Sequence, residues 1–358
     1  MIKFREERQE QELVRKSKMQ KNGLNLQKCS LCPRACGVDR ESGQKGICGQ
    51  TAVVKAARAG LHMWEEPCIS GARGSGTVFF SGCALHCVYC QNHEIANGTA
   101  GKEISIGRLA EIFLELQEQG ANNINLVTAG HFLPQVICAL ERAKDQGLVL
   151  PVVYNTSSYE SVDAIRSLEG HVDVYLPDLK YKSREVARRY SHAPDYFEAA
   201  SAVIKEMVCQ TKEIRFVPEK VLEESVQSGQ RIWQRQPQMT PEEYDIWQEQ
   251  QEEEQFGIMV RGTIVRHLLL PGQLEDSKQL VKYLLDTYGD GIYLSLMSQY
   301  TPQKLTEATY PELARKVTLQ EYDELLEYAL EQGLNYGFMQ DGEAAEESFI
   351  PQFDGAGI

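Results

Sequence analysis

The sequence predicts an α/β fold, a partial (β/α)6 barrel of the TIM type, between residues 71 and 342. Short apolar, β-prone runs alternate with stretches of helical periodicity, and the six runs lie at 77–80, 125–127, 151–154, 172–176, 262–270 and 292–296. Strands that alternate with helices are joined by right-handed crossovers, which makes the strands parallel. Polar groups that follow these runs would then gather at one end of the barrel, where the active sites of such folds lie.

The helices between the runs are predicted from apolar residues at helical spacing and from capping residues. Ser105 precedes a helix whose apolar stripe runs to Leu116, and Pro134 stands where the next helix begins. Further helices are expected around 159–168, 197–207, 280–285 and 319–330.

Three parts of the chain fall outside this barrel. Residues 1–70 are expected to form a charged tail and a small four-cysteine metal module, and residues 343–358 a loose acidic tail. Residues 211–255 are rich in Glu and Gln, hold Trp233 and Trp247, and lack strand periodicity. We interpret them as a partly helical surface insertion whose charge run is either solvated or a binding surface.

Composition excludes several classes of function. Hydrophobic residues make up 42 % of the 358 residues, and the formal net charge of -14 argues against binding to nucleic acid. No apolar run approaches the roughly 20 residues of a membrane span. The charged N-terminus lacks the apolar core of a signal peptide. The two tight clusters among the ten cysteines are therefore expected to be reduced metal ligands, and the cytoplasm is the expected location.

One cysteine cluster organises the predicted chemistry. Residues 81–92 read SGCALHCVYCQN and place Cys83, Cys87 and Cys90 in a C-x3-C-x2-C spacing, with Tyr89 before the last cysteine. Three thiolates can hold three irons of a [4Fe-4S] cluster and leave the fourth iron free to bind a small molecule. A zinc loop or a chance group of buried cysteines is the alternative, although a structural zinc site usually takes four protein ligands.

A second cluster lies nearer the N-terminus. Cys29, Cys32, Cys36 and Cys48 are spaced as C-x2-C-x3-C-x11-C among glycines, which suits a closed all-thiolate site for zinc or iron–sulfur. Four protein ligands favour a structural or electron-transfer role, and the spacing does not decide the metal. Cys68 is expected to be a small buried residue.

These motifs together resemble the radical S-adenosylmethionine (radical SAM) superfamily, and within it the pyruvate formate-lyase (glycyl radical enzyme) activating-enzyme-like group. The likeness covers about residues 29–340 apart from the insertion. It rests on the stretches EEPCISG, CVYCQN, YLPDLKY, IVRHLLLPG and SLMSQYTP.

The resemblance implies roles for the residues of the first cluster and of the turn after the second strand. Cys83, Cys87 and Cys90 would ligate the catalytic [4Fe-4S] cluster, whose open iron would be chelated by the methionine part of S-adenosyl-L-methionine (SAM). Tyr89 would present its backbone, or its backbone and its ring, to the adenine. The turn Thr128-Ala129-Gly130 would accept the amino group of SAM, with His131 in place of the acidic residue that often follows in the family.

The resemblance also implies cofactor contacts at later strand ends. Asp178 and Lys180 match a D-x-K pair that contacts SAM. Asn155 and Thr156, with Asp178 and the Leu176 carbonyl, fall where some relatives hold a monovalent cation, although an acid is usual at the position of Asn155. Arg266 resembles a cofactor-facing arginine, with a barrel-wall salt bridge as the alternative. Gln299 and Tyr300 fall where relatives place another contact to the methionine part of SAM.

The implied function is a radical SAM oxidoreductase that reductively cleaves SAM and abstracts hydrogen from a substrate. The expected substrate is a glycine of a partner glycyl radical enzyme, and the expected electron donor is flavodoxin or ferredoxin. Another peptide, a small metabolite or a nucleotide is an alternative substrate. An alternative of another class is a non-catalytic iron–sulfur or zinc scaffold. The N-terminal cysteines would hold an electron-transfer cluster or a zinc clamp.

Overall fold

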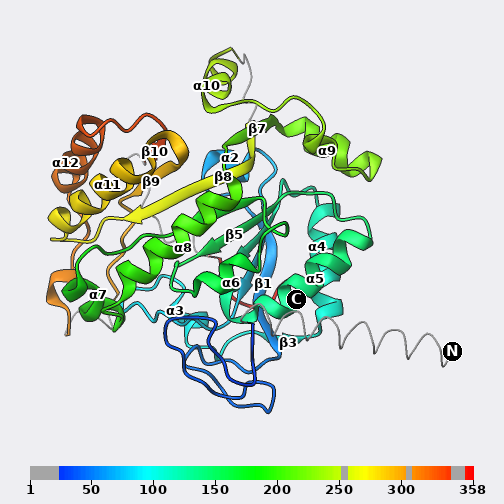
Figure 1. The fold of residues 1–358 in the computed structure, drawn as a ribbon, viewed down its shortest axis with the longest axis horizontal. Coiled ribbons are helices and arrows are strands. Elements are labelled where there is room, and N and C mark those ends of the chain that lie inside the picture. The colour runs from blue at the N-terminus through cyan, green and yellow to red at the C-terminus, as the bar shows by residue number, and fades with distance from the viewer. Residues whose placement is uncertain (1–23, 251–256, 304–308, 340–350) are drawn as a thin grey trace.

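The computed structural model describes residues 24–250, 257–303, 309–339 and 351–358. Its centre is a ten-stranded sheet with the strand order β10-β9-β8-β6-β5-β4-β2-β1-β3, and β7 pairs with β8 outside this path. From β2 to β10 the neighbouring strands along this order are parallel. The predicted α/β fold class is therefore confirmed, and the sheet curves so that helices cover its outer side (Figure 1).

The six predicted strands are six consecutive neighbours in this sheet. They are β2 (Ser75–Phe80), β4 (Ile124–Val127), β5 (Val152–Thr156), β6 (Val174–Pro177), β8 (Gly257–Leu268) and β9 (Tyr293–Met297). Most of their side chains are buried, as expected of parallel strands covered on both faces. A further parallel strand, β10 (Gly337–Met339), was not predicted because three residues are too few to show a period.

The predicted helices are present with shifted ends: α4 (Ile106–Glu118), α5 (Leu133–Asp145), α6 (Val162–Arg166), α8 (Tyr196–Thr211), α11 (Leu274–Tyr288) and α12 (Leu319–Glu331). Ser105 caps α4 by accepting a hydrogen bond from Arg108 N, as its position predicted. The helix α7 (Arg184–Ser191) was not predicted. Among the described residues, no helix combines the length and the apolar character that crossing a membrane requires.

Two antiparallel strands extend the sheet at its β2 edge, and neither was predicted. β1 (Val54–His62) pairs with both β2 and β3 (Lys102–Ile104). The prediction of a loose acidic tail is wrong for residues 351–358, because they lie along β1: Ala59 N donates to Ala356 O over 3.0 Å, and the Phe353 ring meets the edge of Phe79. The rest of that tail, at 340–350, and the N-terminal tail at 1–23 lie outside the described residues.

The insertion is partly helical, as predicted, but it also contains a strand. β7 (Arg215–Pro218) pairs antiparallel with the first part of β8. This strand was not predicted, because four residues are too short a run to show alternation. The helices α9 (Glu219–Ser228) and α10 (Pro241–Glu249) project beyond one end of the sheet (Figure 1). Trp233 anchors the insertion, because its buried indole donates to Val149 O over 2.9 Å.

Candidate active site

A cavity of about 650 Å³ opens at the carboxyl ends of the parallel strands. The structure gathers around it most of the residues that the sequence singled out, from segments far apart in the chain. These are Cys83, Cys87, Tyr89, Cys90, Thr128, Asn155, Asp178, Lys180, Arg266 and Gln299. The expectation that polar groups at successive strand ends converge on one site is thus realised in the fold.

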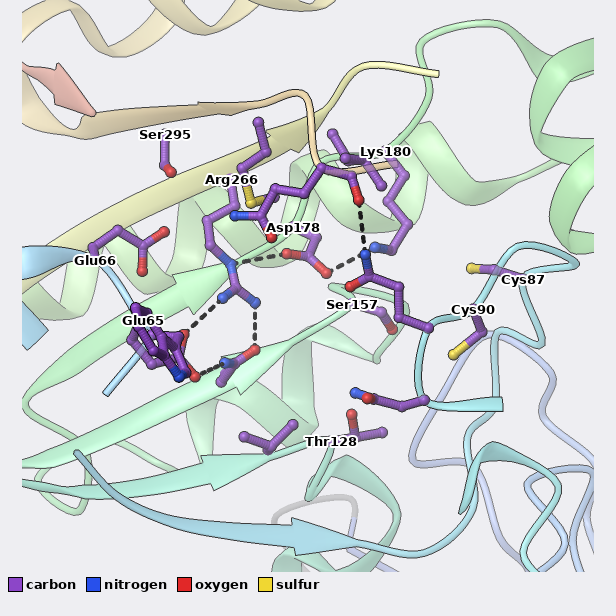
Figure 2. Close-up of a pocket in the computed structure, with 18 of the residues that line it drawn as sticks. Glu65, Glu66, Cys87, Cys90, Thr128, Ser157, Asp178, Lys180, Arg266 and Ser295 are labelled. Atoms are coloured by element: carbon purple, nitrogen blue, oxygen red, sulfur yellow. Dashed lines mark hydrogen bonds and ion pairs between the residues drawn. The ribbon is translucent and has the colours of Figure 1, made fainter. Parts of the chain in front are cut away.

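An ionic network centred on Arg266 forms one wall of this cavity (Figure 2). The guanidinium of Arg266, on β8, bonds Asp178 Oδ1 over 3.0 Å and Glu65 Oε2 over 3.1 Å, and it also donates to the amide oxygen of Asn155. Lys180 Nζ bonds the other oxygen of Asp178 over 2.8 Å. Arg266 therefore faces the cavity and forms a barrel-wall ion pair at the same time, so the two readings of this residue are compatible.

The two cations fix the protonation of the network. Burial alone would raise the pKa of Asp178, but Lys180 and Arg266 lower it below its ordinary value. Burial would lower the pKa of Lys180, but the carboxylate of Asp178 raises it. Asp178 is therefore ionised and Lys180 is protonated at neutral pH.

The three-cysteine loop follows β2 and is held by hydrogen bonds to the end of α7 and by packing against three tyrosine rings. Val88 N donates to Tyr190 O over 2.9 Å, and Ser191 Oγ donates to Cys87 Sγ over 3.2 Å. The buried ring of Tyr89 packs edge-on against three other tyrosine rings, those of Tyr181, Tyr190 and Tyr300. The Tyr89 ring thus anchors the loop to the protein.

The thiols of this loop fit an iron–sulfur cluster chemically. Burial and the neighbouring thiol of Cys87 raise the pKa of both Cys83 and Cys90. Thiolates at these positions therefore need added positive charge, which cluster irons supply. His86, inside the loop, bonds Ile47 O through Nε2 over 2.9 Å.

The four cysteines of the N-terminal module line a second, smaller cavity of about 30 Å³, which also reaches Cys83 and Thr128. Burial raises the pKa of Cys32 to about 12, and the thiols of Cys48, Cys29 and Cys36 add to this rise. All four cysteines therefore border the same cavity. Among the described residues, no three Cys, His, Asp or Glu side chains are gathered as they would be around a single metal ion.

Two arginines of the four-cysteine module connect it to the barrel. Arg34 Nε donates to Ala84 O over 3.0 Å and Nη2 to Leu85 O over 3.3 Å, both in the three-cysteine loop. The same side chain also donates to Ser191 O and His192 O at the end of α7. Arg40 is fully buried and donates to His131 O over 2.6 Å. The four-cysteine module therefore packs directly against the three-cysteine loop.

Several predicted residues point away from the main cavity. Ala129 is buried and Gly130 lines only the small cavity, against the Glu160 carboxylate. The Thr156 hydroxyl bonds Glu160, which also accepts from Tyr154. His131 is buried, and its Nε2 bonds Ser81 O over 2.8 Å. Tyr300 is buried and its hydroxyl donates to Leu313 O, whereas Gln299 remains at the cavity.

Sequence reasoning missed the acids Glu65 and Glu66, which precede the short helix α2 (Pro67–Ser70). Glu65 accepts hydrogen bonds from the side-chain amides of Asn125 and Asn155 and pairs with Arg266. Both acids line the main cavity. The signal that could have identified them is the pair of adjacent acids before the proline in EEPCISG. It was missed because the pair lies between β1 and β2, away from the carboxyl end of any parallel strand, where site residues were expected.

One segment of the chain matches the model of a known protein family. Residues 77–209 match the family model described as "Radical SAM superfamily". This segment is therefore similar to a radical SAM domain. The matched segment runs from β2 into α8 and includes the three-cysteine loop, Asp178 and Lys180. A radical SAM domain implies an enzyme that uses a [4Fe-4S] cluster and SAM.

A curated relative is "Uncharacterized protein MJ0674" of Methanocaldococcus jannaschii, which is 25 % identical over 308 residues, covering 84 % of this chain and 74 % of that protein. Similar solved structures include Streptococcus suis SuiB bound to S-adenosylmethionine, with 11 % identity, a TM-score of 0.43 and coverage of 74 % of this chain and 49 % of SuiB. SuiB bound to the precursor peptide SuiA gives 10 % identity, a TM-score of 0.41 and coverage of 73 % and 47 %. The chain spans about half the length of these structures.

Proposed function

We propose that Cys83, Cys87 and Cys90 hold the [4Fe-4S] cluster of this radical SAM enzyme, and that the main cavity binds SAM and substrate together. The observation that carries the proposal is that the three thiols share one cavity with the Asp178–Lys180–Arg266 network. When bound and reduced, the cluster would supply the electron that splits SAM into methionine and a 5′-deoxyadenosyl radical, which abstracts hydrogen from the substrate.

The residues around the cavity would orient SAM. Lys180 is held by Asp178, so its ammonium is placed to donate to the carboxylate of SAM. Arg266 fixes Asp178 and Asn155 and acts as a positioning residue. Of the turn 128–130, only Thr128 lines the main cavity, and we propose that its backbone carbonyl accepts from the amino group of SAM. Tyr89 would present its backbone to the adenine, because its ring is packed among other tyrosines.

We propose a second metal site at Cys29, Cys32, Cys36 and Cys48, holding zinc or an iron–sulfur cluster. The convergence of all four on one small cavity supports it. We also propose that this N-terminal four-cysteine module and the barrel with its insertion are distinct parts of the chain. Two clusters of metal-binding thiols need a reducing compartment, and we propose the cytoplasm.

For the substrate, we propose a glycine of a partner glycyl radical enzyme, with flavodoxin or ferredoxin as the electron donor. The motifs that resemble the activating-enzyme-like group support this choice. The test is anaerobic electron paramagnetic resonance of a candidate partner after incubation with the enzyme, reductant and SAM. A glycyl radical signal supports the proposal, and its absence from every candidate partner while 5′-deoxyadenosine accumulates would direct the search to other peptides or small molecules.

The core of the proposal is tested by measuring 5′-deoxyadenosine. The protein is purified without oxygen, reconstituted with iron and sulfide, reduced and given SAM, and iron and zinc are counted in the same sample. We expect Cys87→Ala to abolish SAM cleavage, and Cys209→Ala, which removes an exposed cysteine on α8, to leave it unchanged. Retained cleavage in Cys87→Ala with normal iron content would refute the cluster assignment. About eight irons per chain would indicate a second cluster, and about four irons with one zinc a structural zinc site.

A further inference from the structure

Glu66 has a carboxylate oxygen that the protein leaves without a partner. The residue is only 8 % exposed, and its Oε2 has no hydrogen-bond partner, although it lines the main cavity. Glu66 stands at the N-cap of α2, but its side chain does not cap that helix. The nearby Ser295 side chain lowers the pKa of this carboxyl group, but less than burial raises it. The Oε2 oxygen remains available to a molecule in the cavity.

The charges on the cavity wall do not balance. Three carboxyl groups line it, those of Glu65, Glu66 and Asp178, against one lysine and one arginine. Lys180 pairs with Asp178, and Arg266 pairs with Asp178 and Glu65, so both cations are engaged by the other two acids. Glu66 is the acid without a direct ion pair among the described salt bridges.

A buried carboxylate without its own counter-charge is costly, and a cationic ligand removes that cost. Burial raises the pKa of Glu66, and Arg266 offsets only part of this rise. His62, which also lines the cavity, does not supply the missing charge, because burial lowers its pKa to about 4 and keeps it neutral. A cation bound in the cavity would supply the charge that His62 does not.

The position of Glu66 separates it from the cysteine loop. Figure 2 shows Glu66 beside Ser295, on the opposite side of Arg266 from Cys87 and Cys90. Apolar side chains border the same cavity, and two of them are largely open to solvent: Trp64 is 59 % exposed and Met339 is 42 % exposed. A ligand seated at Glu66 would thus combine a cationic head with an apolar stem.

We propose that Glu66 binds the cationic nitrogen group, an ammonium or a guanidinium, of the substrate on which the radical acts. This inference rests on the proposed function and names the chemical class of its substrate. A free alkylamine or alkylguanidine and the side chain of a lysine or arginine in a peptide present the same chemistry to the carboxylate.

The test measures binding of small probes to the reconstituted holoenzyme with SAM, by ligand-observed nuclear magnetic resonance. The probes are butylguanidinium, its neutral isostere butylurea, and the capped peptide acetyl-Gly-Arg-Gly-amide. We expect Glu66→Gln to weaken binding of butylguanidinium at least about tenfold, because a charge-assisted bond is lost, and to leave butylurea binding unchanged. The matched control Glu94→Gln removes an exposed acid just after the cysteine loop and should change neither.

The outcomes distinguish a peptide substrate from a small-molecule substrate, and they include two results that would overturn the inference. A peptide that binds more tightly than butylguanidinium and loses affinity in Glu66→Gln identifies a peptide substrate, whereas equal affinity identifies a small amine or guanidine. Equal binding of butylguanidinium to the wild type and to Glu66→Gln would overturn the inference. So would a loss of SAM affinity in Glu66→Gln as large as the loss for butylguanidinium, because the carboxylate would then serve SAM.

Unchanged butylurea binding and an unchanged melting temperature show that the variant is folded. Production of 5′-deoxyadenosine by the wild type is measured separately. SAM cleavage without selective cation binding would reject this inference alone. Cation binding without cleavage would reject the proposed function instead.

Discussion

Replacing Arg34 should loosen the three-cysteine loop without touching a cysteine. Its guanidinium donates to four backbone carbonyl oxygens: to Ala84 and Leu85 in the loop, over 3.0 and 3.3 Å, and to Ser191 and His192 at the end of α7, over 3.0 and 2.7 Å. Lysine keeps the charge but has a single nitrogen, which cannot span both groups of carbonyls. Arg34→Lys should therefore lose at least two of the four bonds.

The expected effect can be worked out from these contacts. Hydrogen bonds from a charged donor contribute about 1.5–3 kcal/mol each, and the lower value applies because Arg34 is only partly buried. Two lost bonds amount to about 3 kcal/mol, which corresponds to roughly 100-fold in an equilibrium constant. Since the loop is predicted to hold the cluster, we expect Arg34→Lys to release iron up to about 100-fold faster.

The assay is the rate at which an iron chelator removes iron from the reconstituted, SAM-free enzyme under anaerobic conditions. Arg166→Gln is the matched control, because that arginine lies 61 % exposed on α6 and contacts neither cysteine cluster. Iron release from Arg34→Lys at the wild-type rate, with the melting temperature unchanged, would show that the contacts of Arg34 do not hold the loop and would refute the reasoning.

Two further predictions concern stability. Trp233→Phe removes the indole donor to Val149 O and should cost about 1–3 kcal/mol, seen as a fall of a few degrees in melting temperature; an unchanged value would mean that the insertion is not anchored there. Burial lowers the pKa of His267 to about 4, so between about pH 6.5 and 4 the unfolded chain binds a proton that the folded chain does not, and stability falls as the pH falls. His267→Gln should therefore lose less melting temperature between pH 7 and 5 than the wild type, and an equal loss in both proteins would contradict this assignment.

The parallel strands could be predicted because each is a buried apolar run followed by a helix, and both signals are local. β3, β7 and β10 were missed because they are short. β1 was missed because it carries mixed side chains and its pairing depends on other segments. Tertiary contact, not local propensity, makes them strands.

The residues of the candidate active site could likewise be predicted only in part. Asp178 and Lys180 stand at a strand end and were found from the sequence, but Thr156 and Tyr300 also stand at strand ends and turn to buried partners. No local pattern shows which way such a side chain turns. Arg34 was missed because its partners are backbone carbonyls from distant segments, which leave no mark in a motif.

The segment 351–358 has a consequence for how the protein is made. β3 pairs with β1 only at residues 54–56, and the C-terminal segment continues that edge, through Gly355 N to Ala57 O and Ala59 N to Ala356 O. Nearly the whole chain separates these partners. Until residues 355 and 356 leave the ribosome, β1 presents unpaired backbone groups to any other extended chain nearby. Loss of residues 355 and 356 would therefore leave this part of β1 open to pairing with a neighbouring molecule.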